Sequence, residues 1–184
     1  GFRNKKNAFF FEKKIDIKKI EKKINFIISK NQNFIEYSEI GFKYLREISK
    51  IIKKNNGGLL LIDYGYTEKK MKNTLKAYSN HKIANILDNK GNVDITHNIN
   101  FNLFDKFVKK IGGLKNNITT QKKFLIEMGI KQRAEIISKN QNFSKKADIY
   151  YRLRRLIDDN QMGSLFKVMF IRNRRNKFKL GFLN

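Results

Sequence analysis

The sequence has no cysteine, no proline and no tryptophan, and it contains only two histidines among its 184 residues. A chain without cysteine can form no disulfide, no thiolate nucleophile and no cysteine-ligated zinc site. His81 and His97 alone are too few for an ordinary transition-metal site, so we predict no metal centre. No apolar run approaches the length that crosses a bilayer, and we therefore predict no membrane span.

Acidic residues are also scarce: 16 Asp and Glu stand against 41 Lys and Arg, which gives a formal net charge of +25. Such a charge is typical of proteins with an acidic partner, such as nucleic acid or an anionic membrane face. The lysines are scattered, however, and Lys, Asn, Ile and Phe are overused along the whole chain, as an AT-rich coding sequence would produce. Nucleic-acid binding is therefore an open alternative that the charge alone does not favour.

The prediction of the fold and of the candidate site starts from one stretch, residues 57–66. The aliphatic run at 59–62 lacks polar alternation, which predicts a strand that is buried on both faces, as in the centre of a parallel α/β sheet. Ligands of such sheets gather at the carboxyl ends of the strands. Asp63, Tyr64 and Tyr66 follow the run directly and are the first candidates for chemistry, with capping of the next turn by Asp63 as an equal alternative.

The residues before this stretch predict a β-hairpin and then a helix. Short apolar segments at 8–17 and 24–28 predict two antiparallel strands joined by a lysine-rich connection. Apolar residues at helical spacing follow between Ser38, a candidate N-cap, and Gly57. The chain begins at Gly1 without an initiator methionine or an apolar signal core, so we interpret it as starting inside a longer protein.

The residues after the stretch begin with a segment, 67–98, that has little periodicity and predicts a long irregular loop. A helix capped by Asn100 follows, and then a short strand that ends at Thr120, where Thr119 or Thr120 is expected to cap the next helix. The remaining segments predict helices at 121–128, 131–138 and 144–157, a strand at 165–171 and a solvated basic tail at 172–179.

Five short motifs occur in a particular order along the chain. They are Gly-Leu-Leu-Leu-Ile-Asp-Tyr-Gly-Tyr at 58–66, Asn-Thr-Leu-Lys-Ala-Tyr at 73–78, Gly-Asn-Val-Asp-Ile-Thr at 91–96, Thr-Thr-Gln at 119–121 and Met-Gly-Ser-Leu-Phe-Lys-Val at 162–168. Together these motifs resemble the carboxyl-terminal half of the MidA-like methyltransferases. That family includes the mitochondrial arginine methyltransferase that assists assembly of respiratory complex I.

The resemblance implies an α/β fold, namely the carboxyl-terminal part of a class I, Rossmann-like methyltransferase fold with a β-hairpin insertion and extra helices. The last strand would be the antiparallel seventh strand of that fold. Residues 1–184 would belong to a single domain, divided into the hairpin insertion (8–30), a helix with the central strand (38–66), a long loop (67–98) and helices with the last two strands (99–172).

The resemblance also implies a function, which is methyl transfer from S-adenosylmethionine to an arginine of a protein, in related members a complex I subunit. The location would be the mitochondrial matrix in a eukaryote and the cytoplasm in a bacterium. Asp63 would be the catalytic residue that orients the acceptor guanidinium. The residues implied to bind substrate are Tyr64, Gly65, Tyr66, His81, Asp94, Thr96 and Gln121.

The chain departs from the family in one respect that concerns the cofactor. It has no glycine-rich strand-turn-helix, because Gly57 and Gly58 precede a strand rather than follow one. The resemblance therefore implies that the cofactor-binding residues lie upstream of Gly1. Two other functions stay open: an RNA-binding or nucleic-acid methyltransferase module, and an inactive fragment that acts only through protein contacts.

Overall fold

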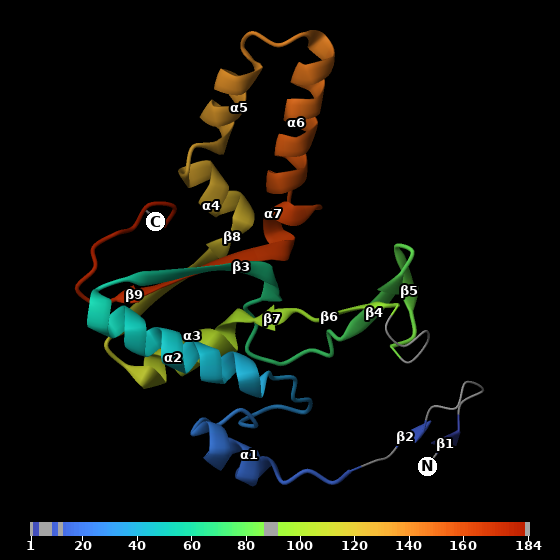
Figure 1. The fold of residues 1–184 in the computed structure, drawn as a ribbon, viewed down its shortest axis with the longest axis vertical. Coiled ribbons are helices and arrows are strands. Elements are labelled where there is room, and N and C mark those ends of the chain that lie inside the picture. The colour runs from blue at the N-terminus through green and yellow to red at the C-terminus, as the bar shows by residue number, and fades with distance from the viewer. Residues whose placement is uncertain (1, 4–8, 11–12, 87–91, 183–184) are drawn as a thin grey trace. The chain divides into compact units, whose positions relative to one another are not determined.

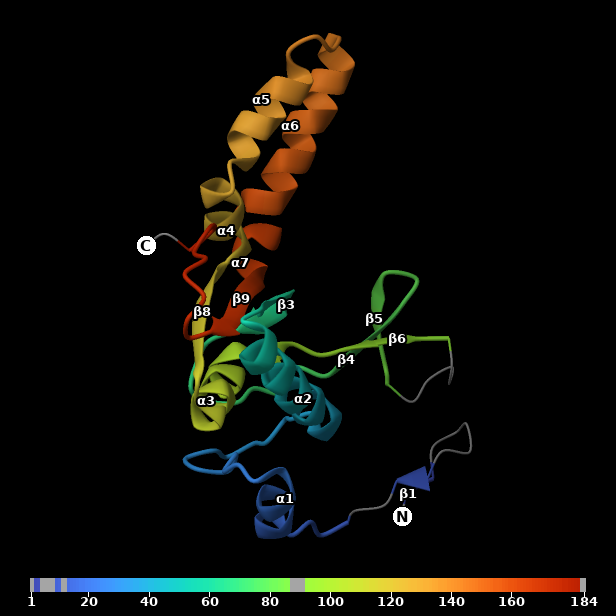
Figure 2. The ribbon, with the colours of Figure 1, turned by 60° about the vertical axis from the view of Figure 1, so that its left-hand side comes forward.

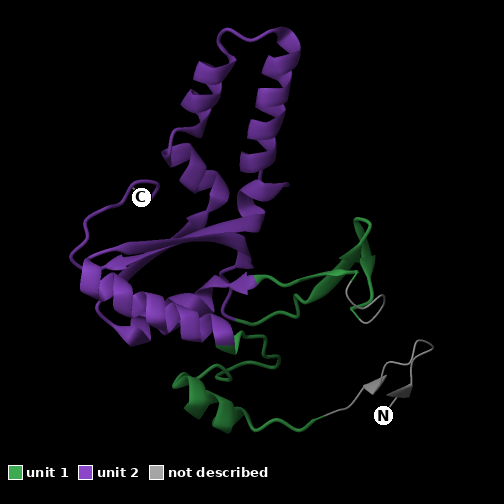
Figure 3. Cartoon of the chain, in the orientation of Figure 1, with its two compact units in different colours: residues 1–39, 70–98 green, residues 40–69, 99–184 purple. Residues whose placement is uncertain are grey.

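The computed structural model of the chain describes residues 2–3, 9–10, 13–86 and 92–182 (Figure 1 and Figure 2). The chain divides into two compact units (Figure 3). Unit 1 contains Gly1–Glu39 and Lys70–Asn98, and unit 2 contains Ile40–Lys69 and Ile99–Asn184. Unit 2 combines a mixed sheet with helices, in agreement with the predicted α/β class.

The sheet of unit 2 is built from β3 (Gly58–Tyr66), β7 (Ile99–Asn100), β8 (Leu114–Thr120) and β9 (Phe166–Asn173), in the order β7-β3-β9-β8. β9 is antiparallel to both β3 and β8, so β3 and β8 run parallel to each other. β3 is parallel to β7 at the end of the strand only. The predicted strands at 59–63 and 165–171, and the antiparallel direction of the second, are confirmed.

Two helices, α2 (Glu39–Asn55) and α3 (Phe101–Ile111), lie together on one face of this sheet (Figure 1). α3 begins at the predicted cap, where the Asn100 side chain accepts a hydrogen bond of 3.0 Å from the Leu103 N–H. The rings of Phe42 and Phe107 meet edge to face with 4.6 Å between their centroids. The aromatic and aliphatic side chains that fill this core are Phe42, Phe101, Phe107, Val108, Met169 and Ile171.

The opposite face of the sheet is covered over β9 but open over β3. A cluster of Phe124, Val168, Phe170 and Phe182 covers β9. Leu60 and Ile62 remain 44% and 46% exposed on the same face, and Tyr64 beside them is also exposed. The prediction that this strand is buried on both faces is therefore wrong for the described residues, because α2 and α3 cover one of its faces only.

The chain between β8 and β9 forms α4 (Gln121–Glu127), α5 (Ile130–Ser138), α6 (Phe143–Ile157) and the single turn α7 (Met162–Leu165). Gly129 separates α4 from α5 with a φ of +81°, which a glycine adopts without steric cost. α5 and α6 form an antiparallel hairpin that projects from the sheet in both views (Figure 1 and Figure 2). The three helices predicted for this region are confirmed.

Unit 1 contains a helix where the sequence predicted a strand. α1 spans Ile17–Ile24, and the Asp16 side chain caps it by accepting the N–H of Lys18 at 3.0 Å. The N–H groups of Ile28 and Ser29 then bond to the Glu21 carboxylate, both at 2.8 Å, and not to a neighbouring strand. These backbone bonds, chiefly that from Ser29, lower the pKa of the Glu21 carboxyl.

The predicted hairpin at 8–30 is therefore wrong at 17–29. Its first strand, predicted at 8–17, overlaps the described strand β2 (Phe9–Phe10), which pairs antiparallel with β1 (Phe2–Arg3), while residues 13–16 form no strand. Residues 8, 11 and 12 of the predicted first strand lie outside the described residues.

The predicted irregular loop at 67–98 contains a small antiparallel sheet. Its strands are β4 (Lys76–Ser79), β5 (Lys82–Ala84) and β6 (Asp94–Thr96), in the order β5-β4-β6. Asn80 and His81 join β4 to β5 as a two-residue turn, both with positive φ, which matches the right-handed twist of a hairpin. The prediction of an irregular segment is wrong here because these strands are too short to show periodicity.

The basic tail predicted at 172–179 is largely solvated from Arg174 onward, but Arg172 and Asn173 belong to β9 and are buried. Arg172 is buried, and its guanidinium donates hydrogen bonds to the Asn176 carbonyl at 3.0 Å and to the Asn117 side chain at 3.3 Å. Phe182 is buried against Phe124 and Phe170, so the chain returns to the sheet after 172–179. Among the described residues, no helix is long and apolar enough to cross a membrane.

Candidate functional site

The carboxyl ends of β3 and β8 lie at one edge of the unit 2 sheet, on either side of the start of β9. Asp63 pairs with Lys167, and Lys167 pairs with Thr120. Side chains of directly opposed residues point to the same face of a sheet. Asp63, Lys167 and Thr120 therefore form a row across one face, at the edge where ligands of open α/β sheets bind.

Asp63 presents a carboxylate to solvent at this edge. The side chain is exposed, and its Oδ1 accepts the Tyr64 N–H at 2.7 Å. The second oxygen, Oδ2, accepts no hydrogen bond from any residue that the structure describes. The alternative interpretation of Asp63 as a cap thus accounts for one oxygen, and the other is available to a ligand.

Tyr64 lies on the opposite face of β3 from Asp63, because successive side chains of a strand alternate. Its ring contacts that of Phe166, the first residue of β9, with 4.0 Å between the centroids. The ring remains partly exposed on the open face beside Ile62. Asp63 and Tyr64 can therefore meet one ligand only beyond the end of the strand.

Gly65 and Tyr66 are buried where β3 meets β7. A Cβ atom on Gly65 would lie 2.5 Å from the Ile99 carbonyl oxygen and 2.5 Å from the Phe101 ring. Only glycine fits this close approach, so packing alone explains the residue at position 65. Contact of Gly65 or Tyr66 with substrate stays a prediction.

Gln121 opens α4 at the same edge, and its side chain is buried. The Nε2 atom donates a hydrogen bond of 2.9 Å to the Leu156 carbonyl, which ties the end of α6 to the start of α4. Thr120 precedes it as the predicted cap, with its Oγ1 accepting the Lys123 N–H at 3.3 Å. The amide of Gln121 therefore has a structural partner, and its contact with substrate stays a prediction.

The other three predicted substrate residues belong to unit 1 and are exposed. His81 occupies the β4–β5 turn with a φ of +61°. Asp94 lies opposite Tyr78, and Thr96 lies opposite Lys76, both in the β4–β6 ladder. The structure thus gathers Asp63 to Tyr66 and Gln121 in unit 2, and His81, Asp94 and Thr96 in one small sheet of unit 1. Their roles toward substrate stay predictions.

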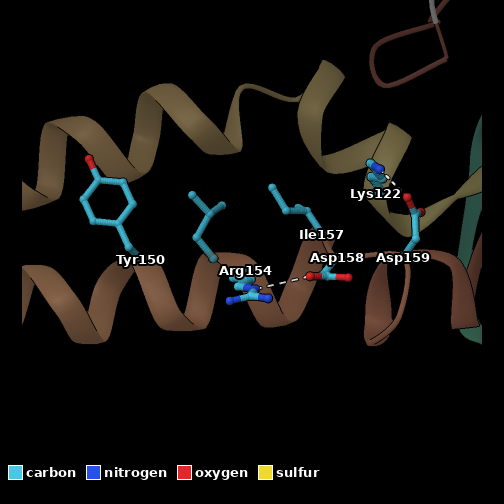
Figure 4. Close-up of a pocket in the computed structure, with 7 residues that line it drawn as sticks. Lys122, Tyr150, Arg154, Ile157, Asp158 and Asp159 are labelled. Carbon is cyan, nitrogen blue, oxygen red and sulfur yellow. Dashed lines mark hydrogen bonds and ion pairs between the residues drawn. The ribbon is translucent and has the colours of Figure 1, made fainter.

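A surface pocket between α4 and α6, of about 480 Å³, was not predicted (Figure 4). Its charged lining consists of two ion pairs: Lys122 with Asp159, and Arg154 with Asp158 at 3.3 Å. The Asn160 N–H, and then the Arg154 guanidinium, lower the pKa of the Asp158 carboxyl. The four charges partner each other: Arg154 and Asp158 are an i,i+4 pair, whereas Lys122 and Asp159 meet only because α4 packs beside the end of α6.

The described residues do not form a loop that fits S-adenosylmethionine. The strand-to-helix junction from β8 to α4 is Thr120-Gln121, without glycine, and β3 leads into an extended segment rather than a helix. A nucleotide-like cofactor needs close backbone approach at such a junction, usually through glycine. No cluster of metal-ligating side chains occurs in the part of the chain that the structure describes.

A family described as "Putative S-adenosyl-L-methionine-dependent methyltransferase" matches residues 3–120. The chain belongs to this family. This methyltransferase family member is similar to animal proteins at low sequence identity. It is 25% identical over 132 residues to the mitochondrial protein arginine methyltransferase NDUFAF7 of Danio rerio, a match that covers 70% of this chain and 30% of the relative.

Two further relatives carry the same name. The Xenopus tropicalis protein is 26% identical over 124 residues, covering 67% of this chain and 28% of that protein. The Caenorhabditis elegans homologue is 32% identical over 77 residues, covering 42% of this chain and 18% of its own length. The chain thus spans less than a third of the length of the curated relatives that it matches.

Solved structures confirm the fold of this family member. The crystal structure of an uncharacterized protein from Burkholderia thailandensis superimposes on this chain with a TM-score of 0.77 and 20% sequence identity. The match covers 97% of this chain and 49% of the Burkholderia chain. A second structure from that bacterium, bound to S-adenosyl-homocysteine, matches 97% of this chain and 47% of its own, with a TM-score of 0.71 and 20% identity. The predicted Rossmann-like methyltransferase fold is therefore confirmed.

Proposed function

We propose that this chain supplies the acceptor side of an S-adenosylmethionine-dependent protein arginine methyltransferase. Support comes from the family match and from relatives named as protein arginine methyltransferases. The observation that carries the proposal is the exposed Asp63 carboxylate at the carboxyl end of β3, with Oδ2 available. Binding at this edge is the general behaviour of open α/β sheets.

The chemistry of the edge suits a guanidinium. A carboxylate accepts parallel N–H bonds from arginine, which fixes the plane and the direction of the group. Asp63 would hold the acceptor arginine in this way, and the exposed part of the Tyr64 ring, on the opposite face of β3, would contact another part of the substrate. Such positioning of the acceptor nitrogen is the part of methyl transfer that these residues can perform.

The cofactor site is proposed to lie in residues outside this chain, upstream of Gly1. The described junctions between strands and helices lack the glycine-rich turn that the cofactor needs, and the structural relatives are about twice as long. Because the curated relatives are named as mitochondrial protein arginine methyltransferases, we further propose a protein substrate and a location in the mitochondrial matrix in a eukaryote or the cytoplasm in a bacterium. A subunit of respiratory complex I is the substrate that the resemblance of the sequence motifs implies.

Replacing Asp63 tests the proposal in the full-length protein. Asp63→Asn keeps the shape of the side chain but removes the charge, so we expect about a 100-fold lower turnover of an arginine-containing acceptor. S-adenosylmethionine affinity, measured by calorimetry, should stay unchanged. Transfer of a labelled methyl group to the acceptor measures the turnover.

The matched control for this test is Asp148→Asn. Asp148 is an exposed carboxylate on α6 that forms an ion pair of 2.9 Å with Arg152. Its substitution should leave both turnover and cofactor affinity unchanged. Equal turnover of the Asp63→Asn and Asp148→Asn proteins would remove Asp63 from the site and contradict the proposal.

A further inference from the structure

The tip of the α5–α6 hairpin carries apolar side chains that are exposed to solvent and are not packed in the core. Phe143, the first residue of α6, is 88% exposed, and Ile136 in the last turn of α5 is 69% exposed. Ile137 beside it is also exposed. The end of α5 and the start of α6 lie at the far end of the projecting hairpin (Figure 1 and Figure 2), and these three residues belong to those two helix ends. Apolar groups concentrated at a protruding tip mark an interaction surface.

Within residues 136–147 every charged side chain is basic, and the exposed Glu135 directly precedes this segment. Residues 136–147 include Lys139, Lys145 and Lys146 and no acidic residue. The acidic residues that flank the segment are Glu135 and Asp148, and Asp148 is neutralised by its ion pair with Arg152. The tip is therefore both apolar and cationic.

Part of the backbone at the tip is hydrogen-bonded within the tip. The Gln141 N–H donates to the Ser138 carbonyl at 3.0 Å. The Asn142 side chain caps α6 by accepting the Lys145 N–H at 2.9 Å, and the Asn142 carbonyl accepts the Lys146 N–H at 3.0 Å. These bonds reduce, but do not remove, the number of unpaired N–H groups that the loop would bring to an apolar medium.

We propose that this tip, defined as Ile136, Ile137, Phe143 and the lysines 139, 145 and 146, docks onto an anionic lipid surface. The apolar side chains would enter the boundary between headgroups and acyl chains. The lysine stems would extend along them and place their ammonium groups at the lipid phosphates. This surface lies outside the acceptor edge, and the inference does not depend on methyl transfer.

The distribution of residues along α6 favours lipid over nucleic acid. Single-stranded nucleic acid is held by aromatic stacking together with cationic groups, often arginine. The arginines of α6, at positions 152, 154 and 155, lie about 13 Å or more along the helix from Phe143. The tip itself offers two isoleucines and three lysines, which suit acyl chains and phosphates, and a single aromatic ring, Phe143; the nearest arginine is Arg133 of α5, one turn before Ile136.

Vesicle co-sedimentation of the whole chain tests the inference. The probe is vesicles of phosphatidylcholine with about one-third phosphatidylglycerol, compared with pure phosphatidylcholine. We expect binding to the anionic vesicles and about 100-fold weaker binding to the neutral ones, because three lysines each contribute about five-fold. Phe143→Ser and Ile136→Ser should each reduce partitioning about ten-fold. Lys145→Gln should reduce it about five-fold, through the lost charge.

The matched control is Ile83→Ser, the same substitution at a side chain that is 76% exposed but belongs to β5 of unit 1. It should leave vesicle binding unchanged, and thermal melts should confirm that all variants remain folded. Three outcomes would overturn the inference: no binding of the unaltered chain, equal binding to neutral vesicles, or equal loss in Ile83→Ser and Ile136→Ser. Self-association that is lost in Phe143→Ser, without vesicle binding, would identify a second copy as the occupant and would equally overturn it.

Discussion

Strands β3 and β9 pair with each other along seven residues, yet they differ in their neighbouring strands and in the burial of their side chains. β9 has a strand on each side, and its residues Val168, Met169 and Ile171 are fully buried. β3 has β9 on one side and only the short β7 on the other among the described residues, and Leu60 and Ile62 stay exposed. Both strands are rich in large apolar residues.

The difference indicates that the apolar side chains of β3 are suited to deeper burial than the described residues of this chain provide. A run of four aliphatic residues without polar alternation is typical of a strand with both faces covered and both edges paired. The chain matches 49% of a structural relative with the same fold. We therefore propose that residues outside the chain cover the open face of β3 and pair with its edge.

The largest expected effect lies in β9. Met169→Ala removes a fully buried side chain between α3 and the sheet, and should lower the free energy of unfolding by about 2–5 kcal/mol. The exposed Met128 provides the matched control, since Met128→Ala should change it by less than about 0.5 kcal/mol. Urea denaturation measures both, and equal losses would contradict the burial assigned to β9.

An intermediate effect is expected at Gly65, where β3 passes closest to β7. Gly65→Ala forces a methyl group against the Ile99 carbonyl and the Phe101 ring, and should cost about 1–3 kcal/mol of unfolding free energy. At Gly57, just before β3, an added Cβ atom would meet no other atom within 4 Å, so Gly57→Ala should change little. If both variants unfolded at the same urea concentration, the close β3–β7 approach would be refuted.

The smallest effect in this chain is expected on the open face. Leu60→Ser should change the unfolding free energy by only about 0.5 kcal/mol or less, because the side chain is nearly half exposed. The same substitution in the full-length protein should cost about 2 kcal/mol or more if that face is then buried. Similar costs in the two proteins would contradict the proposed cover over β3.

The sequence predicted the helices and strands that have a long periodic pattern or clear capping residues at their ends. α2, α3 and the helices after β8 follow clear helical spacing, and Asn100 and Thr120 cap helices as expected. The strand at 24–28 failed because alternation predicts which side chains are buried but not a partner strand: Ile24, Phe26 and Ile28 are buried, yet the Ile28 N–H bonds to the Glu21 carboxylate. The sequence also contains Ile17, Ile20 and Ile24 at helical spacing after Asp16, and these specify α1.

The candidate site was predictable in position but not in its partners. Asp63 and Tyr64 lie in the carboxyl-terminal half of β3, which runs on to Tyr66 where the sequence predicted a turn, and their role at the site stays a prediction. Because side chains alternate along a strand, Asp63 and Tyr64 lie on opposite faces of β3. The hydrogen bond between the Gln121 amide and the Leu156 carbonyl depends on how α4 and α6 pack. Contacts of this kind between distant residues leave no local pattern, which also explains why the pocket of Figure 4 was missed.

The central claim is that this chain holds the acceptor side of a methyltransferase and that the cofactor site is built by residues outside it. Calorimetric titration of S-adenosylmethionine into the folded 184-residue chain tests this claim most directly. The account predicts no heat of binding from a soluble, folded chain. One-to-one binding would contradict it, because the cofactor would then be held by residues that we assign to the acceptor side.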